Sequence, residues 1–260
     1  MRILVLLTAL AMPIVAYFSQ RGTFGPDNGA ISNQYPTLLV AAGYAFAIWS
    51  LIFTLDLVLG VWQMLTTKRQ DTSLDRIRPA VALGFGLTAS WMIVFSQRWF
   101  WLALAIIWLS LGAMLYASIA AARSPVASQA YDWKVRWALG LHAGWLSLAA
   151  FLNTAQVIVA EQLLPTDAML SWSAGLWALA GMLLLAINHA LRGHPAYLLA
   201  ALWGLAGVMV KQSASSLAGS DASAWIAGVL ALGLVLQTAW LWSRRQRLAT
   251  RSPHSSAASA

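Results

Sequence analysis

Eight long apolar stretches alternate with short polar segments along the chain. A helix needs about 20 predominantly apolar residues to cross a bilayer core of about 30 Å. Because the stretches have roughly this length, we expect each of them to be a membrane-spanning helix. They cover residues 3–19, 39–63, 78–96, 99–122, 136–160, 169–190, 195–211 and 223–243. The pattern therefore predicts an all-α fold, a polytopic transmembrane helical bundle.

The ends and connections of this pattern leave some alternatives open. The stretch 3–19 fits a retained helix and also a cleaved signal peptide that starts at Arg2, although no clean small-x-small cleavage site precedes Ser19. The longest connection, 20–38, fits a lid over the helices and also a mobile loop. Residues 244–260 are basic and then rich in Ser and Ala, and we expect a tail that is disordered from Thr250 onward.

The basic residues are distributed unevenly over the connections. If the N-terminus is cytoplasmic, thirteen of the sixteen Lys and Arg residues fall on the cytoplasmic side of the eight predicted helices. The positive-inside rule predicts such an asymmetry, and a missed or extra helix would destroy it, because every later connection would change sides. The sequence thus predicts an integral membrane protein of the bacterial inner (cytoplasmic) membrane, with both termini in the cytoplasm.

Composition excludes several other classes of protein. Hydrophobic residues make up 60% of the 260 positions and charged residues only 9%, whereas a soluble domain has about 25% charged residues. A water-soluble globular protein is excluded, and so is a nucleic-acid-binding chain, despite the net charge of +8. The absence of cysteine excludes disulfides, iron–sulfur clusters and thiolate-bound haem. No Walker, HExxH or EF-hand motif is present, and we predict no catalytic residues and no metal ligands.

Two polar residues lie well inside the predicted helices. Asp56 is about seven residues, or about 10 Å, from the cytoplasmic end of the second helix, and His142 is about six residues into the fifth, which starts on the same side. Their matched depth predicts a buried polar pair, because a lone carboxylate in hydrocarbon is costly. A role in helix packing and a role in proton relay or ligand binding both fit this pair.

Spacing places aromatic and polar residues on one face of each of these two helices. Trp49, Phe53, Asp56 and Gly60 recur at three- and four-residue intervals on the second helix. The corresponding set on the fifth helix is His142, Trp145, Ala149, Asn153 and Gln156. Such faces should point into the bundle, where they would either line a cavity for a flat apolar ligand or form a packed tryptophan-rich core.

Three motifs at these positions resemble the TspO/translocator-protein (TspO/MBR) family, also called tryptophan-rich sensory proteins. The stretch 43–53, GYAFAIWSLIF, is similar to the family's second-helix pattern, with Phe53 where Tyr is usual. The stretch 88–95, TASWMIVF, is similar to Asn-x-Ala-Trp-x-x-x-Phe, with Thr88 in place of Asn. The stretch 145–153, WLSLAAFLN, resembles Trp-x-x-Phe-Ala-x-x-Leu-Asn of the fifth helix at identical spacing.

The resemblance covers roughly residues 1–160 and implies a five-helix TspO-like core in that region. Residues 161–243 would then be an additional three-helix transmembrane segment, as in a longer, divergent member. Family members bind porphyrins and other planar hydrophobic ligands between their helices, which implies porphyrin or haem as a ligand here. By resemblance, the ligand-binding residues are Trp49, Phe53, Trp91, Trp145, Ala149 and Asn153. Thr154 stands where the sterol-recognition pattern requires Tyr, so the resemblance does not extend to sterol binding.

The expected function is binding of a planar hydrophobic small molecule, of the tetrapyrrole class, for sensing or translocation. A proton-coupled secondary transporter that uses Asp56 and a non-catalytic membrane scaffold are the alternatives. The expected partners are the lipid bilayer and the hydrophobic ligand. The pair Gly140 and Gly144, four residues apart, fits close helix packing within one chain or between the chains of a homo-oligomer.

Overall fold

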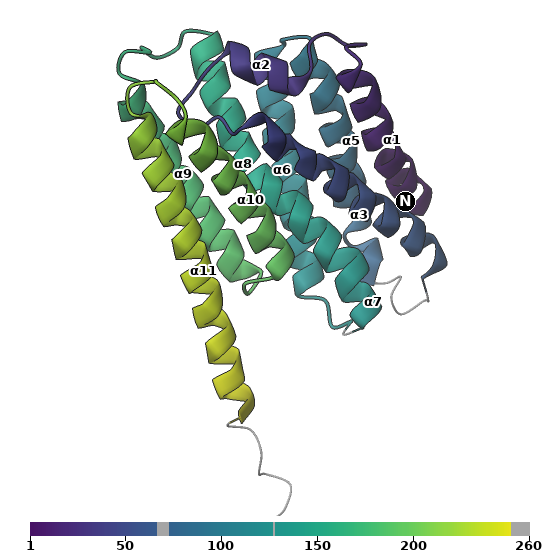
Figure 1. Ribbon diagram of the computed structural model, residues 1–260. Coiled ribbons are helices and arrows are strands. Elements are labelled where there is room, and N and C mark those ends of the chain that lie inside the picture. Colours follow the sequence, from purple (N-terminus) through teal and green to yellow (C-terminus); the bar gives the residue numbers. More distant parts are fainter. Residues whose placement is uncertain (67–72, 127, 251–260) are drawn as a thin grey trace, which may run out of the picture.

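The computed structural model describes residues 1–66, 73–126 and 128–250 (Figure 1), and five of its long helices close a ring of pairwise contacts. Around the ring, each helix packs against the next in the order α1, α3, α8, α6, α5 and back to α1. Their bounds are Arg2–Gln20 for α1, Ile48–Trp62 for α3, Arg78–Ser96 for α5, Phe100–Ala122 for α6 and Trp137–Ala160 for α8. Among the described residues there is no β-strand, and an all-α polytopic bundle is confirmed.

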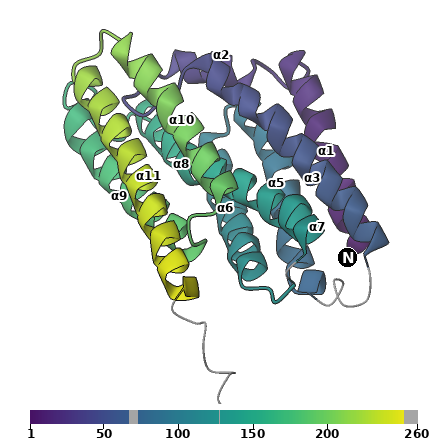
Figure 2. The same cartoon turned by 60° about the horizontal axis from the view of Figure 1, so that its bottom comes forward.

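Three further helices lie on the α8 side of the ring. They are α9 (Met169–Ala190), α10 (Pro195–Ser213) and α11 (Ser220–Thr250). Helix α10 packs between α8 and α11, and Figure 2 shows it next to α11 with α8 behind. The approach to α8 is close, since a Cβ atom on Gly144 would lie only 2.6 Å from the backbone oxygen of Tyr197. Gly140 and Gly144 thus pack against α10 of the same chain.

Seven helical segments among the described residues are long and apolar enough to cross a membrane. The eighth predicted span, 195–211, is present as the 19-residue helix α10 but falls short in hydropathy, because Lys211 and Gln212 lie in its last turn. Helix α10 nevertheless runs between the same two ends of the bundle as α9 and α11 (Figure 1). With eight helices of alternating direction, α1 begins and α11 ends at the same end of the bundle.

Short elements complete the chain. They are α2 (Asn28–Gln34), the 3-10 helices η1 (Gly43–Ala47) and η2 (Gln63–Leu65), α7 (Gln129–Tyr131) and the π-helical turn η3 (Asp132–Arg136). The side chain of Asp27 caps α2 by accepting a hydrogen bond from the backbone N–H of Ala30 at 2.9 Å. Helix α2 crosses one end of the ring (Figure 1) and packs against α5. Part of the connection 20–38 therefore lies over one end of the ring.

The predicted start of the second span at residue 39 is wrong. Residues 36–42 are not helical, and the chain becomes helical only at Gly43. The segment Thr37–Ala42 is mostly buried, so its backbone needs partners other than water. Helices α10 and α11 supply them. Gln212 Nε2 donates to the carbonyls of Thr37 at 3.0 Å and Val40 at 3.1 Å, and Ser223 Oγ donates to the carbonyl of Leu38.

The remaining boundaries lie close to the predicted ones, except at the C-terminus. Helix α11 continues to Thr250 rather than ending at 243, so the basic beginning of the predicted tail is helical. The predicted disordered part, residues 251–260, lies outside the described residues. So do Lys68 and Arg69, two of the thirteen basic residues that we expect on the cytoplasmic side. The division at residue 160 stays a prediction, and contacts of α10 with α8 and η1 join its two parts.

Candidate functional site

A chain of hydrogen bonds runs through the buried centre of the ring. Asp56 on α3 and His142 on α8, both fully buried, face each other with 2.8 Å between Oδ2 and Nδ1. On the other side of the imidazole, Nε2 lies 3.1 Å from Oγ1 of Thr88 on α5. Thr88 Oγ1 in turn lies 2.9 Å from Oγ of Ser110 on α6, which donates to the carbonyl of Gly84 at 3.0 Å. Four helices of the ring thus meet in one polar chain.

The directions of these hydrogen bonds fix the charge of the pair. Because the single hydroxyl proton of Ser110 goes to Gly84, Thr88 donates to Ser110 and accepts from Nε2–H of His142. The other imidazole nitrogen and the Asp56 carboxyl then share one proton. Whichever of the two atoms holds this proton, the pair as a whole carries no net charge. This arrangement keeps a carboxyl group inside the bundle without a buried net charge.

Aromatic rings surround the imidazole. Phe85 stacks on His142 with ring centroids 5.7 Å apart and planes 7° apart. Trp49 meets the same imidazole edge-on, also at 5.7 Å, and contacts Trp145 at 5.9 Å. The polar chain is therefore packed directly against the tryptophans that the sequence singles out for ligand binding.

Five of the six predicted ligand-binding residues line one narrow cavity: Trp49, Trp91, Trp145, Ala149 and Asn153. Its volume is about 20 Å³, enough for about one water molecule. The other lining residues are Ser32, Val40, Phe46, Leu152 and Gln156. Ser32 belongs to α2, so this helix closes the cavity from the end of the ring. The two stripes predicted from spacing meet here across the ring.

Three residues that line this narrow cavity have unpaired hydrogen-bond donors. Nε1 of Trp49, Nε1 of Trp145 and Nδ2 of Asn153 are buried and have no hydrogen-bond partner in the described part of the chain. The Oδ1 atom of Asn153 is used, because it accepts from Nε1 of Trp91 at 2.9 Å. Buried N–H groups without an acceptor are costly, so their gathering at one cavity is suited to a bound group that offers acceptor oxygens.

The sixth predicted residue, Phe53, lies in a second and wider cavity of about 530 Å³. This cavity opens between α1, the connection to α2 and α3, and Phe46 and Trp49 belong to both cavities. Phe53 stacks on Trp49 at 5.2 Å, with planes 21° apart, so the indole ring of Trp49 lies between Phe53 and the other four residues. The two cavities are therefore neighbours with a shared aromatic wall.

Sequence reasoning missed some residues of the site. Phe46 lines both cavities and contacts Trp145 edge-on at 6.0 Å; its place within the motif 43–53 was a usable signal. Thr88 and Ser110 complete the hydrogen-bond chain of His142. For Thr88 the signal was its place in the motif 88–95, where it replaces the usual polar Asn. Ser110 carried no signal, because a single serine in an apolar helix has many roles.

Comparison with known proteins identifies the family of the chain. No curated protein and no solved structure matches the chain. The family model described as TSPO-like protein, in contrast, matches residues 2–240. Beyond α8, this range includes α9, α10 and most of α11. Since the match covers most of the chain, this membrane protein belongs to the TSPO-like protein family.

Proposed function

We propose that the protein binds a planar hydrophobic small molecule of the tetrapyrrole class in its membrane-embedded ring, for sensing or translocation. The observation that carries the proposal is the narrow cavity lined by Trp49, Trp145 and Asn153, whose buried N–H groups have no hydrogen-bond partner among the described residues. A tetrapyrrole offers the matching chemistry, because its flat ring stacks on indoles and its carboxylate substituents accept hydrogen bonds.

The sizes of the two cavities indicate how such a ligand would bind. The narrow cavity, at about 20 Å³, cannot hold the macrocycle, whereas about 530 Å³ in the wide cavity falls within the usual range for small-molecule sites. We place the ring of the ligand in the wide cavity, against Phe53 and Trp49. Displacement of the shared wall, Phe46 and Trp49, would then bring an acceptor group of the ligand to the unpaired donors. No covalent step belongs to this proposal.

Titration of the purified protein with a panel of porphyrins, followed by tryptophan quenching and Soret absorbance, tests the proposal. Ala149→Leu adds apolar bulk in the narrow cavity, so we expect weaker binding with folding intact. The matched control is Ala178→Leu on α9, where the side chain is exposed on the outside of the bundle. Equal porphyrin affinity of the parent and Ala149→Leu would place the ligand elsewhere.

A second pair of variants tests the role of stacking. Trp145→Ala removes an aromatic surface that is 1% exposed, and a lost aromatic contact of about 0.5–1.5 kcal/mol corresponds to roughly threefold to tenfold in affinity. Trp240→Ala, on the outer part of α11, removes an indole that is 47% exposed and should leave porphyrin binding intact. Equal losses in both variants would indicate unspecific adsorption to tryptophans.

The shared proton of Asp56 and His142 favours a second candidate function, proton-coupled transport. In that case substrate uptake into proteoliposomes depends on a pH gradient, and Asp56→Asn abolishes this dependence. If neither porphyrin binding nor coupled uptake is found, the tryptophans serve packing and a scaffold role gains support. The location that we propose is the bacterial inner membrane, with both termini in the cytoplasm.

A further inference from the structure

A second concave site lies far from the tryptophan-lined ring, where α6 and α9 end and α11 leaves the bundle. The cavity has a volume of about 530 Å³. Its lining is strongly basic and comprises Ala122, Arg123, His189, Ala190, Arg192, Leu241, Arg244 and Arg245. Four arginines thus surround one cavity whose lining contains no acidic residue.

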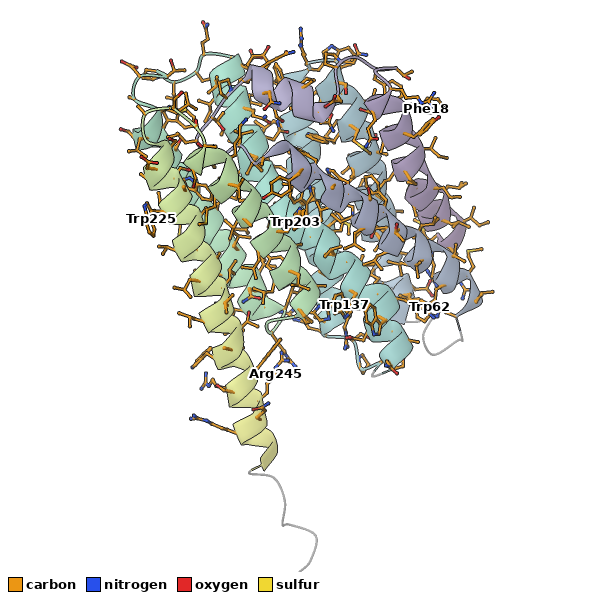
Figure 3. All side chains as sticks on the ribbon, in the orientation of Figure 1. Phe18, Trp62, Trp137, Trp203, Trp225 and Arg245 are labelled. Atoms are coloured by element: carbon orange, nitrogen blue, oxygen red, sulfur yellow. The ribbon has the colours of Figure 1, made fainter. Side chains whose placement is uncertain are left out.

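These arginines are not neutralised within the described chain. No carboxylate of the described residues lies within 4 Å of the four guanidinium groups, and the nearby Asp132 pairs instead with Arg136 and His194. Arg245 points back from α11 toward the α9–α10 turn (Figure 3) and donates from Nη2 to the carbonyl of Arg192 at 2.6 Å. This hydrogen bond holds α11 next to the α9–α10 turn, and both segments carry arginines of the cavity.

One of the four arginines, Arg192, has an unfavourable backbone conformation. Arg192 has φ of 58°, in the left-handed region where glycine is favoured, and Gly193 follows with φ of 67°. An arginine at a position suited to glycine is unfavourable for the backbone alone.

The surroundings of the cavity are those of a membrane interface. The Arg244 guanidinium lies 4.7 Å from the ring centre of Trp240, and Trp242 is also partly exposed, as is usual for indoles at the level of lipid headgroups. On the membrane side, α11 presents exposed apolar residues such as Leu236, which is 60% exposed. Acyl chains thus have an apolar surface directly next to the basic cavity.

We propose that this basic cavity binds the headgroup of an anionic phospholipid with two phosphates, of the cardiolipin class. Planar guanidinium groups match phosphate oxygens in a bidentate manner, and four of them provide two guanidinium groups for each of the two singly charged phosphodiesters. Basic pockets between helices at the cytoplasmic face are suited to such lipids, and the charge distribution predicts this face to be cytoplasmic. The apolar flank of α11 favours a lipid over free phosphate. The proposal is independent of porphyrin binding.

Native mass spectrometry of the purified full chain with added cardiolipin, phosphatidylglycerol or phosphatidylcholine tests this site. We expect retention in that order, with cardiolipin strongest. The double variant Arg123→Gln/Arg244→Gln should weaken cardiolipin binding about 25-fold, at about fivefold per arginine. The matched control is Arg76→Gln, an exposed arginine before α5 on the same face of the bundle, which should leave cardiolipin binding unchanged.

A second variant separates the lipid site from folding. Arg192→Gly relieves the left-handed backbone, so its thermal stability should be equal to or above that of the parent while cardiolipin binding falls about fivefold. Equal cardiolipin affinity of parent and variants, or an equal loss in Arg76→Gln, would overturn the proposal. Displacement of cardiolipin by millimolar inorganic phosphate would also overturn it, because the occupant would then be a free phosphate.

Discussion

At the scale of single residues, the buried pair shows how the bundle tolerates a carboxyl group. His142→Ala leaves Asp56 without its only hydrogen-bond partner among the described residues, and removal of one member of a buried pair costs about 3–5 kcal/mol. Asp56→Asn keeps a polar group of the same shape next to Nδ1, and its cost should be about 1 kcal/mol. Thermal unfolding in detergent measures both. A similar loss of stability in both variants would contradict the conclusion that Asp56 and His142 share one proton.

For His194, in the turn before α10, we expect an effect of pH on stability. Burial lowers the pKa of His194 below its ordinary value of 6.5, Asp132 opposes this effect, and Arg136 and Arg245 add to it. The neutral Nδ1 atom is also needed, since it accepts the N-capping hydrogen bond from the N–H of Ala196 at 3.3 Å.

The direction of the pH effect follows from this lowered pKa. As pH falls below about 6.5, the unfolded chain takes up a proton that folded His194 resists, so its contribution to stability is complete above 6.5 and declines below it. We expect a lower melting temperature at pH 5.5 than at pH 7.5. His194→Asn keeps a capping oxygen without a titrating ring and should reduce this difference. An unchanged difference would mean that other groups cause it.

At the scale of helices, α8 and α10 depend on a close approach. A Cβ atom at Gly144 would meet Tyr197 O at 2.6 Å and the Cβ of Ala200 at 2.9 Å, so Gly144→Ala must push the two helices apart. We expect a loss of about 1–3 kcal/mol, as for other overpacked interiors. Gly175→Ala on α9 is the matched control, because its Cβ would meet nothing within 4 Å. The control should be neutral or more stable by up to about 1 kcal/mol. Equal melting temperatures for the two variants would contradict this interface.

Apolar run length predicted where the helices lie, but it failed at residues 39–42. Leu39, Val40 and Ala41 are apolar because the segment is buried, and burial is compatible with any backbone whose polar groups have partners. Here the partner is Gln212, which lies 172 to 175 residues further along the chain. A local pattern cannot show such a partner, so the non-helical entry to η1 was not predictable from the run itself.

The sequence predicts those parts of the site that depend only on which residues share one face of a helix. Three- and four-residue spacing brought Trp145, Ala149 and Asn153 to the cavity, and matched depth brought Asp56 next to His142. Spacing fixes the face of one helix but not the rotation of its neighbours. Phe53, one turn from Trp49, therefore lies behind the indole ring in the wider cavity rather than in the narrow one.

For the whole molecule, the count of crossings decides where the termini lie. Helix α9 begins at one end of the bundle, just after Asp167, and α11 passes Arg245 at the opposite end (Figure 1). A reporter inserted at Asp167 should therefore read as external and one inserted after Arg245 as cytoplasmic, which alkaline phosphatase and green fluorescent protein insertions measure. Two reporters on the same side would refute eight crossings, and a reversed result would refute the proposed orientation.

The hydrogen-bond partners of Thr37–Ala42 also determine when this segment can fold during synthesis. A ribosome delivers these residues to the membrane long before it has made Gly207, whose carbonyl accepts from the N–H of Ala42 at 2.9 Å, or Gln212 and Ser223. Until these late residues emerge from the translocon, the early segment has unpaired backbone groups and must stay near water or a chaperone. Because Val40 and Phe46 line the narrow cavity, its wall is completed only when synthesis is nearly finished.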